Sequence, residues 1–509
     1  MTDTEPTART TAGVVRGRTE DGVQVFRGVP YARPPIGERR WLPAEPAIPW
    51  SGVRDASADG PVCPQPGRGP VPSLLGYTID PAAMSEDCLT LTVWTPGADD
   101  RRRPVVVWIH GGGFLTGAGS LPLYSGASPA RHGDVVVVAI NYRVGPFGYL
   151  DCHPGDRSAG NRGLTDQALA LQWVADNVAA FGGDPGNVTA VGQSGGAWSI
   201  LTLLGMPDAP ALRRAILQSP PLGSPMRTAD DEAGIRELYR SVLGVGDDAA
   251  VRALPASALI AAVPEMIGRT AEWGRYLPVF QPHVDGRYLH ASVWDDVPTH
   301  SPHTEIMIGW TSREFAFFFG REPKPEDVPP SRLVERMRWS FGDAADKALD
   351  RYRDLYRTDS VQELLTCYAG DEMFRIPCLD RAAALSAGGL PVHAYEFGLS
   401  LSGSTEVFGG AHCLEIPFVF GTFDAMRLGD AVLTRDVDAD TARTATGAMR
   451  SAWLAYARDG DPAVGATAGW APFSAGAPNG MVFCEQGVVA APTGNLGASL
   501  RAVWDELRA

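Results

Sequence analysis

Six short runs of the chain consist almost entirely of apolar residues, many of them β-branched. They span residues 105–109, 135–140, 188–191, 215–217, 306–308 and 392–395. A strand with one wet face would alternate apolar and polar positions, whereas continuous apolar character is typical of parallel strands that are covered on both faces. The pattern therefore predicts a buried, mainly parallel sheet.

Between these runs, the apolar residues change to the spacing of a helix. From Leu164 to Phe181 they recur every three or four positions, and Gly182 and Gly183 then end the repeat. A later helix is expected around residues 449–456 and should stop at Gly460. Strands that alternate with helices predict an α/β fold with a mainly parallel, doubly wound sheet.

Residues 224–297 break this alternation and have a helical pattern. We expect a single domain over residues 1–509, with a helical cap beside the pocket at about 224–297 and a further helical insertion at about 322–376. The proline-rich stretch 61–72 is too short for a domain linker and is predicted to be a structured surface loop.

Composition and charge narrow the possible partners. The 509 residues are 44% hydrophobic and 20% charged, and the formal net charge is −15. Nucleic acids and anionic membranes require a concentrated positive surface, so we expect neither as a partner. No apolar run suits a secretory signal or a membrane span, which predicts a cytoplasmic protein. The seven cysteines form no CxxC pair, so no metal or other cofactor is expected.

The first chemical motif is the sequence GQSGG at residues 192–196. It directly follows the apolar run 188–191 and precedes a helix-compatible run. A serine on a tight strand-to-helix turn is typical of the nucleophile in α/β hydrolytic enzymes, and the flanking glycines let neighbouring elements approach. The motif makes Ser194 the candidate nucleophile.

The second motif, HGGGF at residues 110–114, closes the apolar run 105–109. Such a glycine turn supplies backbone amides to an oxyanion, because a side chain would block the approach of the substrate carbonyl. We assign Gly112, Gly113 and, after the nucleophile, Gly195 as the three donors. His110 is expected to be structural.

The general base and its acidic partner should follow the nucleophile along the chain, the acid first. Three histidines come into question: His303 in a turn before the run 306–308, His393 within an apolar strand, and His412 in a glycine-flanked loop. Glu314 follows the run 306–308, and the carboxyl end of a strand is where catalytic groups of such sheets lie. Spacing alone leaves the choice among the histidines open.

Strings along nearly the whole chain resemble the type-B carboxylesterase family, which includes the cholinesterases, and in particular its bacterial members. They are FRGVPYARPPIGERRW, SEDCLTLTVWTP, PVVVWIHGGGF, INYRVGPFGYL, NRGLTDQALALQWV, FGGDPGNVTAVGQSGG, RRAILQS, AHCLEIPFVFG and WLAYARDGDP. The resemblance implies an α/β-hydrolase fold, a triad of Ser194, Glu314 and His412, and an oxyanion hole at Gly112, Gly113 and Gly195. Cys63 and Cys88 match a disulfide that family members often carry; whether it forms here stays open.

The chain departs from the family pattern at three places. Gln193 stands where the family usually has Glu, which removes a negative charge beside the nucleophile and should alter how polar partners are held near His412. Gly195 replaces an alanine but keeps the amide donor. Pro220 and Pro221 follow Ser219 where a small residue is common, so the pocket wall is expected to differ.

The expected function is hydrolysis of a small carboxylic ester, with an aryl or short- to medium-chain alkyl group, by a monomer or weak homo-oligomer. The candidate pocket walls are Phe114, Trp198, Trp310, Phe315 and Phe318. Two alternatives are kept because the fold does not fix the chemistry. One is a hydrolase or tailoring enzyme acting on a specialised lactone, amide or carbamate; the other is a non-catalytic binding protein that resembles the cholinesterases.

Overall fold

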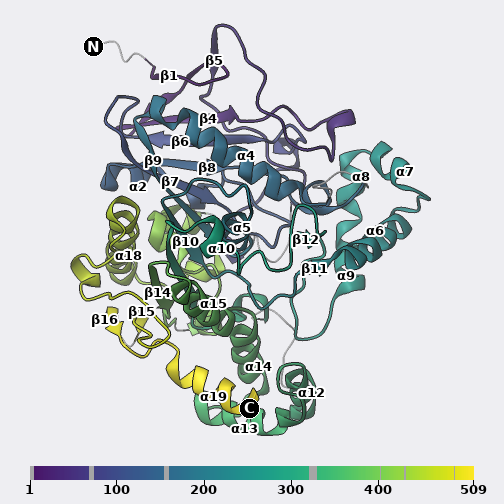
Figure 1. Ribbon diagram of the computed structural model, residues 1–509, viewed down its shortest axis with the longest axis vertical. Coiled ribbons are helices and arrows are strands. Elements are labelled where there is room, and N and C mark those ends of the chain that lie inside the picture. The colour runs from purple at the N-terminus through teal and green to yellow at the C-terminus, as the bar shows by residue number, and fades with distance from the viewer. Residues whose placement is uncertain are drawn as a thin grey trace.

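A large twisted sheet forms the centre of the protein, with helices on both faces (Figure 1). The computed structural model describes residues 5–67, 74–153, 160–319, 329–401, 403–428, 431–485 and 488–508. In this part of the chain the sheet has 11 strands in the order β16-β15-β14-β13-β10-β9-β7-β8-β6-β4-β3.

Seven neighbouring strands of the sheet, from β15 to β8, run parallel, and the strands at both edges run antiparallel. The parallel strands are β7 (Arg103–Ile109), β8 (Val136–Ile140), β9 (Gly183–Gln193), β10 (Arg214–Gln218), β13 (Glu305–Thr311), β14 (Val392–Phe397) and β15 (Gly480–Glu485). The antiparallel strands are β3 (Arg18–Glu20), β4 (Val23–Pro30), β6 (Thr90–Thr95) and β16 (Val488–Thr493).

The continuous apolar runs of the central strands supply two separate cores. In β13, Ile306 and Ile308 belong to one buried cluster and Met307 to the other. In β8, Val138 and Val137 divide in the same way. Successive side chains of a strand point to opposite faces, so a strand with a core on each side needs an apolar residue at every position. This explains why all six predicted strands are present.

Helices cover each face of the sheet. One face packs against α4 (Arg162–Asn177), α5 (Gly195–Leu204) and α15 (Ile376–Ala387), and the other against α2 (Ala127–Gly133), α16 (Ile416–Phe420) and α18 (Ala439–Asp459). The predicted helix ends hold at two glycines. Gly460 ends α18 with φ 80°, whereas α4 changes into a 3-10 turn at Val178 before Gly182 reverses the chain with φ 79°.

Four helices project to one side of the sheet (Figure 1). They are α6 (Ala229–Leu243), α7 (Asp248–Ala253), α8 (Ala256–Ala261) and α9 (Val263–Thr270). They fall in the stretch 224–297, which also contains the short paired strands β11 (Arg227–Thr228) and β12 (His283–Val284) and begins α10 (Val297–His300). The expected helical pattern of this stretch is therefore present.

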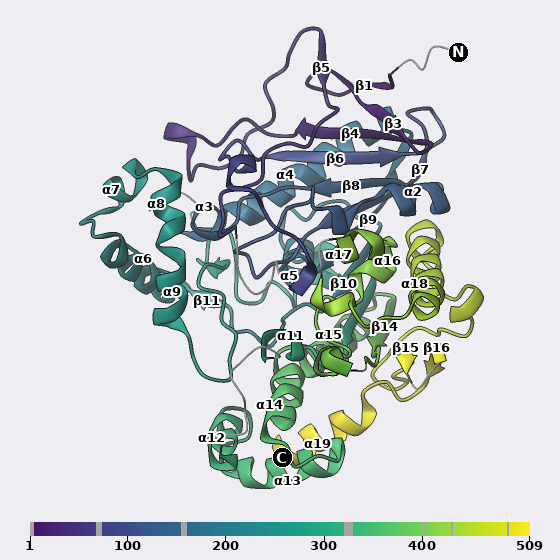
Figure 2. The same cartoon turned by 180° about the vertical axis from the view of Figure 1, so that it is seen from behind.

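A second helical group lies at the end of the molecule where the chain terminates (Figure 2). It contains α12 (Pro330–Phe341), α13 (Ala345–Tyr356), α14 (Val361–Gly370) and α19 (Ala498–Arg508). Residues 322–328 of the expected insertion lie outside the described residues, as do residues 68–72 of the proline-rich stretch. Shorter elements complete the chain: α3 (Gly145–Tyr149), α11 (Ala316–Phe319), α17 (Phe423–Leu428), β1 (Thr7–Arg9), β2 (Val14–Arg16) and β5 (Val53–Asp55).

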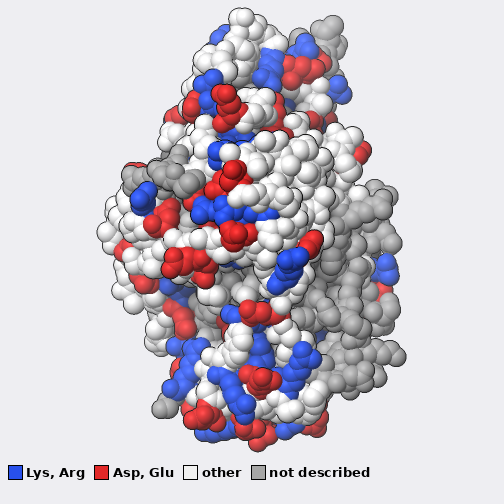
Figure 3. All heavy atoms as spheres, turned by 90° about the vertical axis from the view of Figure 1, so that its right-hand side faces the viewer, with Lys and Arg blue, Asp and Glu red and all other residues white. Residues whose placement is uncertain are grey.

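Basic and acidic side chains are interspersed on the face drawn in Figure 3. No patch of one sign dominates what this view shows of the described residues. Across the described helices, none combines the length and the apolar character that a membrane crossing requires.

Candidate active site

Ser194 is the single residue between β9 and α5. Its backbone φ of 55° lies in the left-handed region, a conformation that costs a serine about 1–3 kcal/mol. Two glycines make the turn possible: a Cβ at Gly192 would lie 2.6 Å from the backbone of Gly196, and a Cβ at Gly196 would overlap the carbonyl oxygen of Ile109. The tight turn raises Ser194 at the carboxyl edge of the sheet.

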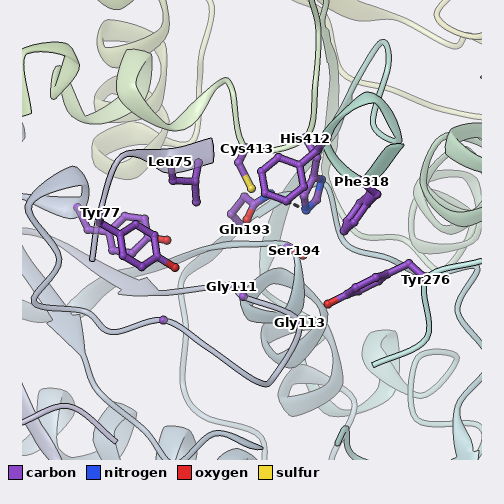
Figure 4. Close-up of a pocket in the computed structure, with 14 residues that line it drawn as sticks. Leu75, Tyr77, Gly111, Gly113, Gln193, Ser194, Tyr276, Phe318, His412 and Cys413 are labelled. Carbon is purple, nitrogen blue, oxygen red and sulfur yellow. Dashed lines mark hydrogen bonds between the residues drawn. The ribbon is translucent and has the colours of Figure 1, made fainter. Parts of the chain in front are cut away.

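A glycine loop continues from β7 and passes beside Ser194 (Figure 4). Gly112 and Gly113 have φ values of 108° and 61°, which residues with a side chain rarely adopt. A Cβ at Gly112 would also overlap the carbonyl oxygen of Thr116. The amides of Gly112, Gly113 and Gly195 donate no hydrogen bond to another described residue. All three can therefore receive an anionic oxygen.

Glu314 and His412 come together from distant parts of the chain. Glu314 lies three residues after the end of β13, and His412 lies in the loop before α16. The His412 Nδ1 and the Glu314 Oε2 are 2.5 Å apart, and the other carboxylate oxygen accepts the amide of Thr311 at 2.7 Å. Both side chains are buried. The carboxylate thus fixes the ring and its tautomer, with the proton on Nδ1.

The second ring nitrogen of His412 is occupied by a neighbour of the nucleophile. The Nε2 of His412 lies 3.0 Å from the Nε2 of Gln193, the last residue of β9. Because the Nδ1 proton is donated to Glu314, a neutral imidazole presents a lone pair at Nε2, and the Gln193 amide donates to it. No hydrogen bond joins Ser194 to His412 in this arrangement. The sequence suggested that position 193 would affect the polar surroundings of His412, and this contact agrees with that expectation.

The charges around His412 favour its protonated form. Burial alone lowers the pKa of this imidazole, but the Cys413 side chain and the Glu314 carboxylate outweigh it and raise the pKa well above the usual range. Three phenylalanine rings surround the imidazole, with centroids at 4.9–5.8 Å. An imidazolium formed here by proton transfer would be stabilised by charge and shielded from water.

The other candidate histidines lie elsewhere. His393 is buried in β14 and packs edge-on against Tyr456 and Trp470. His303 is exposed in the turn before β13. His110 stands next to the glycine loop, but burial lowers its pKa to about 4, so it stays neutral, as expected for a structural residue.

A buried polar chain continues behind the histidine. Glu415 accepts a hydrogen bond from the Nε2 of Gln218 at 3.2 Å, and the Oε1 of Gln218 accepts the indole N–H of Trp453 at 3.1 Å. Burial, together with the charge of Glu314, raises the pKa of Glu415 to about 7. This carboxyl group lies three residues after His412, so its proton is part of the charge balance of the site.

Two adjoining cavities meet at Ser194. They measure about 430 and 370 Å³, counting their mouths, and share four wall residues: Gly113, Ser194, Tyr276 and Phe318. The first cavity also contains His412, Gln193 and the rest of the glycine loop, and is completed by Leu75, Tyr77, Tyr124, Phe317 and Cys413. The second contains Gly195 and is completed by Phe114, Trp198, Pro221, Ser224, Pro278, Gln281, Met373 and Phe374.

Three of the five expected aromatic walls line these cavities. Phe114 and Trp198 contribute to the second cavity, and Phe318 contributes to both. Phe315 lies behind Phe318, with ring centroids 5.0 Å apart, and lines neither cavity. Trp310 is fully buried on β13, and its indole donates to Glu396 at 2.7 Å, away from both cavities. A residue on a covered strand points into a core, which explains the position of Trp310.

Sequence reasoning missed several wall residues. Tyr276 stacks on Phe318 at 4.5 Å and separates the two cavities, yet it comes from the irregular segment between α9 and β12, where no periodicity marks it. Cys413 directly follows His412 and has φ 72°, so its neighbour could have identified it. Pro221 lies in the wall of the second cavity, in agreement with the expected change there.

Metal and disulfide chemistry receive no support from the described residues. Within the described ranges, no three His, Cys, Asp or Glu side chains form a group able to hold a metal ion. All seven cysteines are buried free thiols. Cys63 and Cys88 are close enough to interact, and burial together with Cys63 raises the pKa of the Cys88 thiol.

The fold and the strand-to-helix turn define an α/β-hydrolase. The sequence profile of the carboxylesterase family matches residues 4–490. The chain therefore belongs to the carboxylesterase family, as its sequence motifs predicted, and is a carboxylic ester hydrolase.

Individual relatives are similar over nearly their whole length. Phenmedipham hydrolase of Pseudarthrobacter oxydans is 40% identical over 489 residues, which cover 95% of this chain and 96% of the relative. Para-nitrobenzyl esterase of Bacillus subtilis is 36% identical over 463 residues, with 88% and 89% coverage. The crystal structure of a carboxylesterase from Geobacillus stearothermophilus superposes with a TM-score of 0.84 at 33% identity and covers 98% of this chain and 99% of its own.

Proposed function

We propose that the protein is a serine carboxylesterase that uses Ser194, His412 and Glu314 as its triad and forms an acyl-enzyme. The observation that carries this proposal is the 2.5 Å contact between Glu314 and His412 at the wall of the cavity that contains Ser194. A serine on a strained turn, a buried histidine and an orienting carboxylate are the parts that nucleophilic acyl transfer requires.

The reaction begins with an exchange of partners at His412. The Nε2 lone pair leaves the Gln193 amide and accepts the proton of Ser194 as Oγ attacks the ester carbonyl carbon. Glu314 stabilises the imidazolium that results. The negative charge on the carbonyl oxygen is received by the amides of Gly112, Gly113 and Gly195, each worth about 3 kcal/mol in related enzymes.

The tetrahedral intermediate then collapses. The bond to the alcohol oxygen breaks, His412 gives its proton to that oxygen, and the acyl group stays on Ser194. Water repeats the sequence: it loses a proton to His412, attacks the acyl carbon and releases the carboxylic acid with the regenerated serine. The residues alone supply every proton transfer in this cycle.

We further propose that the whole chain acts as one hydrolase domain and that residues 224–297 are its cap. Tyr276, Pro278 and Gln281 from this segment stand in cavity walls beside Ser194. The aromatic and aliphatic character of both cavities favours aryl and short- to medium-chain alkyl esters. Phenmedipham, the compound in the name of one relative, is a direct additional test substrate.

The test compares the wild-type protein with Ser194→Ala on p-nitrophenyl esters of increasing acyl length, with a fluorophosphonate label alongside. We expect the label on the wild type only, and a fall in turnover of about 10⁵- to 10⁶-fold in the variant. Ser241→Ala, on the exposed side of α6, is the matched control. Folded wild-type protein that neither labels nor turns over esters would contradict the proposal and favour a binding protein.

A further inference from the structure

The acyl part and the alcohol part of a substrate enter different cavities if Ser194 and His412 act as proposed, and the inference below rests on that function. His412 must protonate the departing alcohol oxygen, so the alcohol lies toward the first cavity, whose wall contains His412. The second cavity, on the Gly195 side, is left for the acyl part. Its chemistry therefore selects what is attached to the carbonyl carbon.

The second cavity is apolar over most of its wall but carries three polar side chains. Ser224 and Gln281 are 8% and 7% exposed, and Tyr276 stands where the two cavities join. The Oγ of Ser224 is fully buried and has no hydrogen-bond partner among the described residues. A buried hydroxyl left unpaired costs about 1–3 kcal/mol. Such a group at a cavity wall calls for a partner inside the cavity.

The other two groups are equally available. The hydroxyl of Tyr276 lies so close to Gly113 that a Cβ there would overlap it, which puts it beside the glycine loop. Neither it nor the carboxamide of Gln281 forms a hydrogen bond with another described residue. Burial raises the pKa of Tyr276 to about 12, so the phenol keeps its proton. All three side chains offer an oxygen that accepts hydrogen bonds.

The donor that fits these acceptors is an N–H group on the acyl side of the carbonyl. The carbonyl oxygen itself is directed to the glycine amides, and a hydrocarbon acyl chain would leave all three oxygens unpaired. We propose that Ser224, Gln281 and Tyr276 adapt the second cavity to acyl groups that carry N–H beside the carbonyl carbon, so that the enzyme favours aryl carbamates over the matching aryl esters.

The chemistry is the same acyl transfer. The oxygen of Ser194 bonds to the carbamate carbon, the bond to the aryl oxygen breaks, and His412 carries the serine proton to the aryl oxide. Water then cleaves the carbamoyl-enzyme, and the carbamic acid released decomposes to an amine and carbon dioxide. No oxidant or cofactor takes part.

The test uses two substrates that differ at one position. In p-nitrophenyl N-phenylcarbamate the group between ring and carbonyl is N–H, and in p-nitrophenyl phenylacetate it is CH₂. The ratio of their kcat/KM values is measured for the wild type, Ser224→Ala and Tyr276→Phe. Dividing each variant's ratio by the wild-type ratio removes the intrinsic difference in reactivity between the two compounds.

We expect each variant to lower the carbamate-to-ester ratio by about 2- to 10-fold, the effect of losing one hydrogen bond. Met373→Leu, an apolar change in the same wall, should alter both rates together and keep the ratio. An unchanged ratio in both Ser224→Ala and Tyr276→Phe would overturn the inference, as would a wild type that cleaves only the phenylacetate. Turnover of both compounds that persists in Ser194→Ala would instead overturn the proposed function.

Discussion

Replacement of Glu415 by glutamine tests the electrostatics behind the site. The side chain is completely buried, and one carboxylate oxygen has no partner among the described residues. Burial first, and then the charge of Glu314, raise the pKa of Glu415 from 4.5 to about 7. Glutamine keeps the shape and the acceptor for Gln218, but it removes the ionisable proton.

The direction of the effect follows from proton linkage. Below pH 4.5 the carboxyl group is neutral in both states and imposes no charge penalty. Between 4.5 and about 7 the unfolded chain has lost the proton while the native protein keeps it, so stability falls as pH rises. Above about 7 the native group is ionised too, and the cost levels off at about 3 kcal/mol, because one pKa unit corresponds to about 1.4 kcal/mol. Glu415→Gln should recover most of this at pH 8 and almost none at pH 4.5.

A proton count avoids the need for reversible unfolding. Near pH 6 the native carboxyl should be about 90% protonated and the unfolded one about 3%. Complete unfolding of the wild type in urea should therefore release about 0.9 proton more than unfolding of Glu415→Gln, measured with a pH-stat or an indicator dye. Glu335→Gln, exposed on α12, is the control for the substitution itself. Equal proton release from wild type and Glu415→Gln would refute the reasoning.

Three further substitutions test the nucleophile turn and the glycine loop. Gln193→Glu places a charge about 3 Å from the Nε2 of His412 and should move the acidic limb of the kcat/KM profile to higher pH by about one unit; an unmoved limb would contradict the contact. Gly195→Ala brings a Cβ to 3.2 Å from the Phe114 ring, so we expect a folded enzyme that prefers shorter acyl chains on p-nitrophenyl esters. Gly112→Ala, which overlaps backbone at φ 108°, should lower kcat by about 10²- to 10³-fold, and activity near wild type would argue against an oxyanion role for this loop.

The sheet could be predicted because each of its central strands needs apolar residues on both faces. Residues 306–308 show this: the two outer isoleucines and the methionine between them enter different cores. Helix ends were less certain. The repeat from Leu164 continues to Phe181, but the α-helix stops at Asn177 and a 3-10 turn completes it, because apolar spacing does not distinguish the two kinds of turn.

The parts of the site that lie on sheet edges were also predictable from local motifs. The turn at Ser194 and the loop through Gly112 require glycine for steric reasons, and these requirements appear in the sequence itself. Pairing of Glu314 with His412 depends on two segments 98 residues apart, which spacing alone could not join. The contact between Gln193 and His412 depends on side-chain direction, which no periodic pattern encodes.

Chemistry and selectivity come from different parts of this chain, and this division explains which residues were missed. The nucleophile, the donors and the acid–base pair follow strands whose apolar pattern fixes their position, so motif and fold agree there. Tyr276 and Gln281 come from an irregular segment that has no partner strand to fix its register. Changes in that segment should therefore alter the ratio between substrates, whereas changes at the strand ends should lower the turnover of every ester alike.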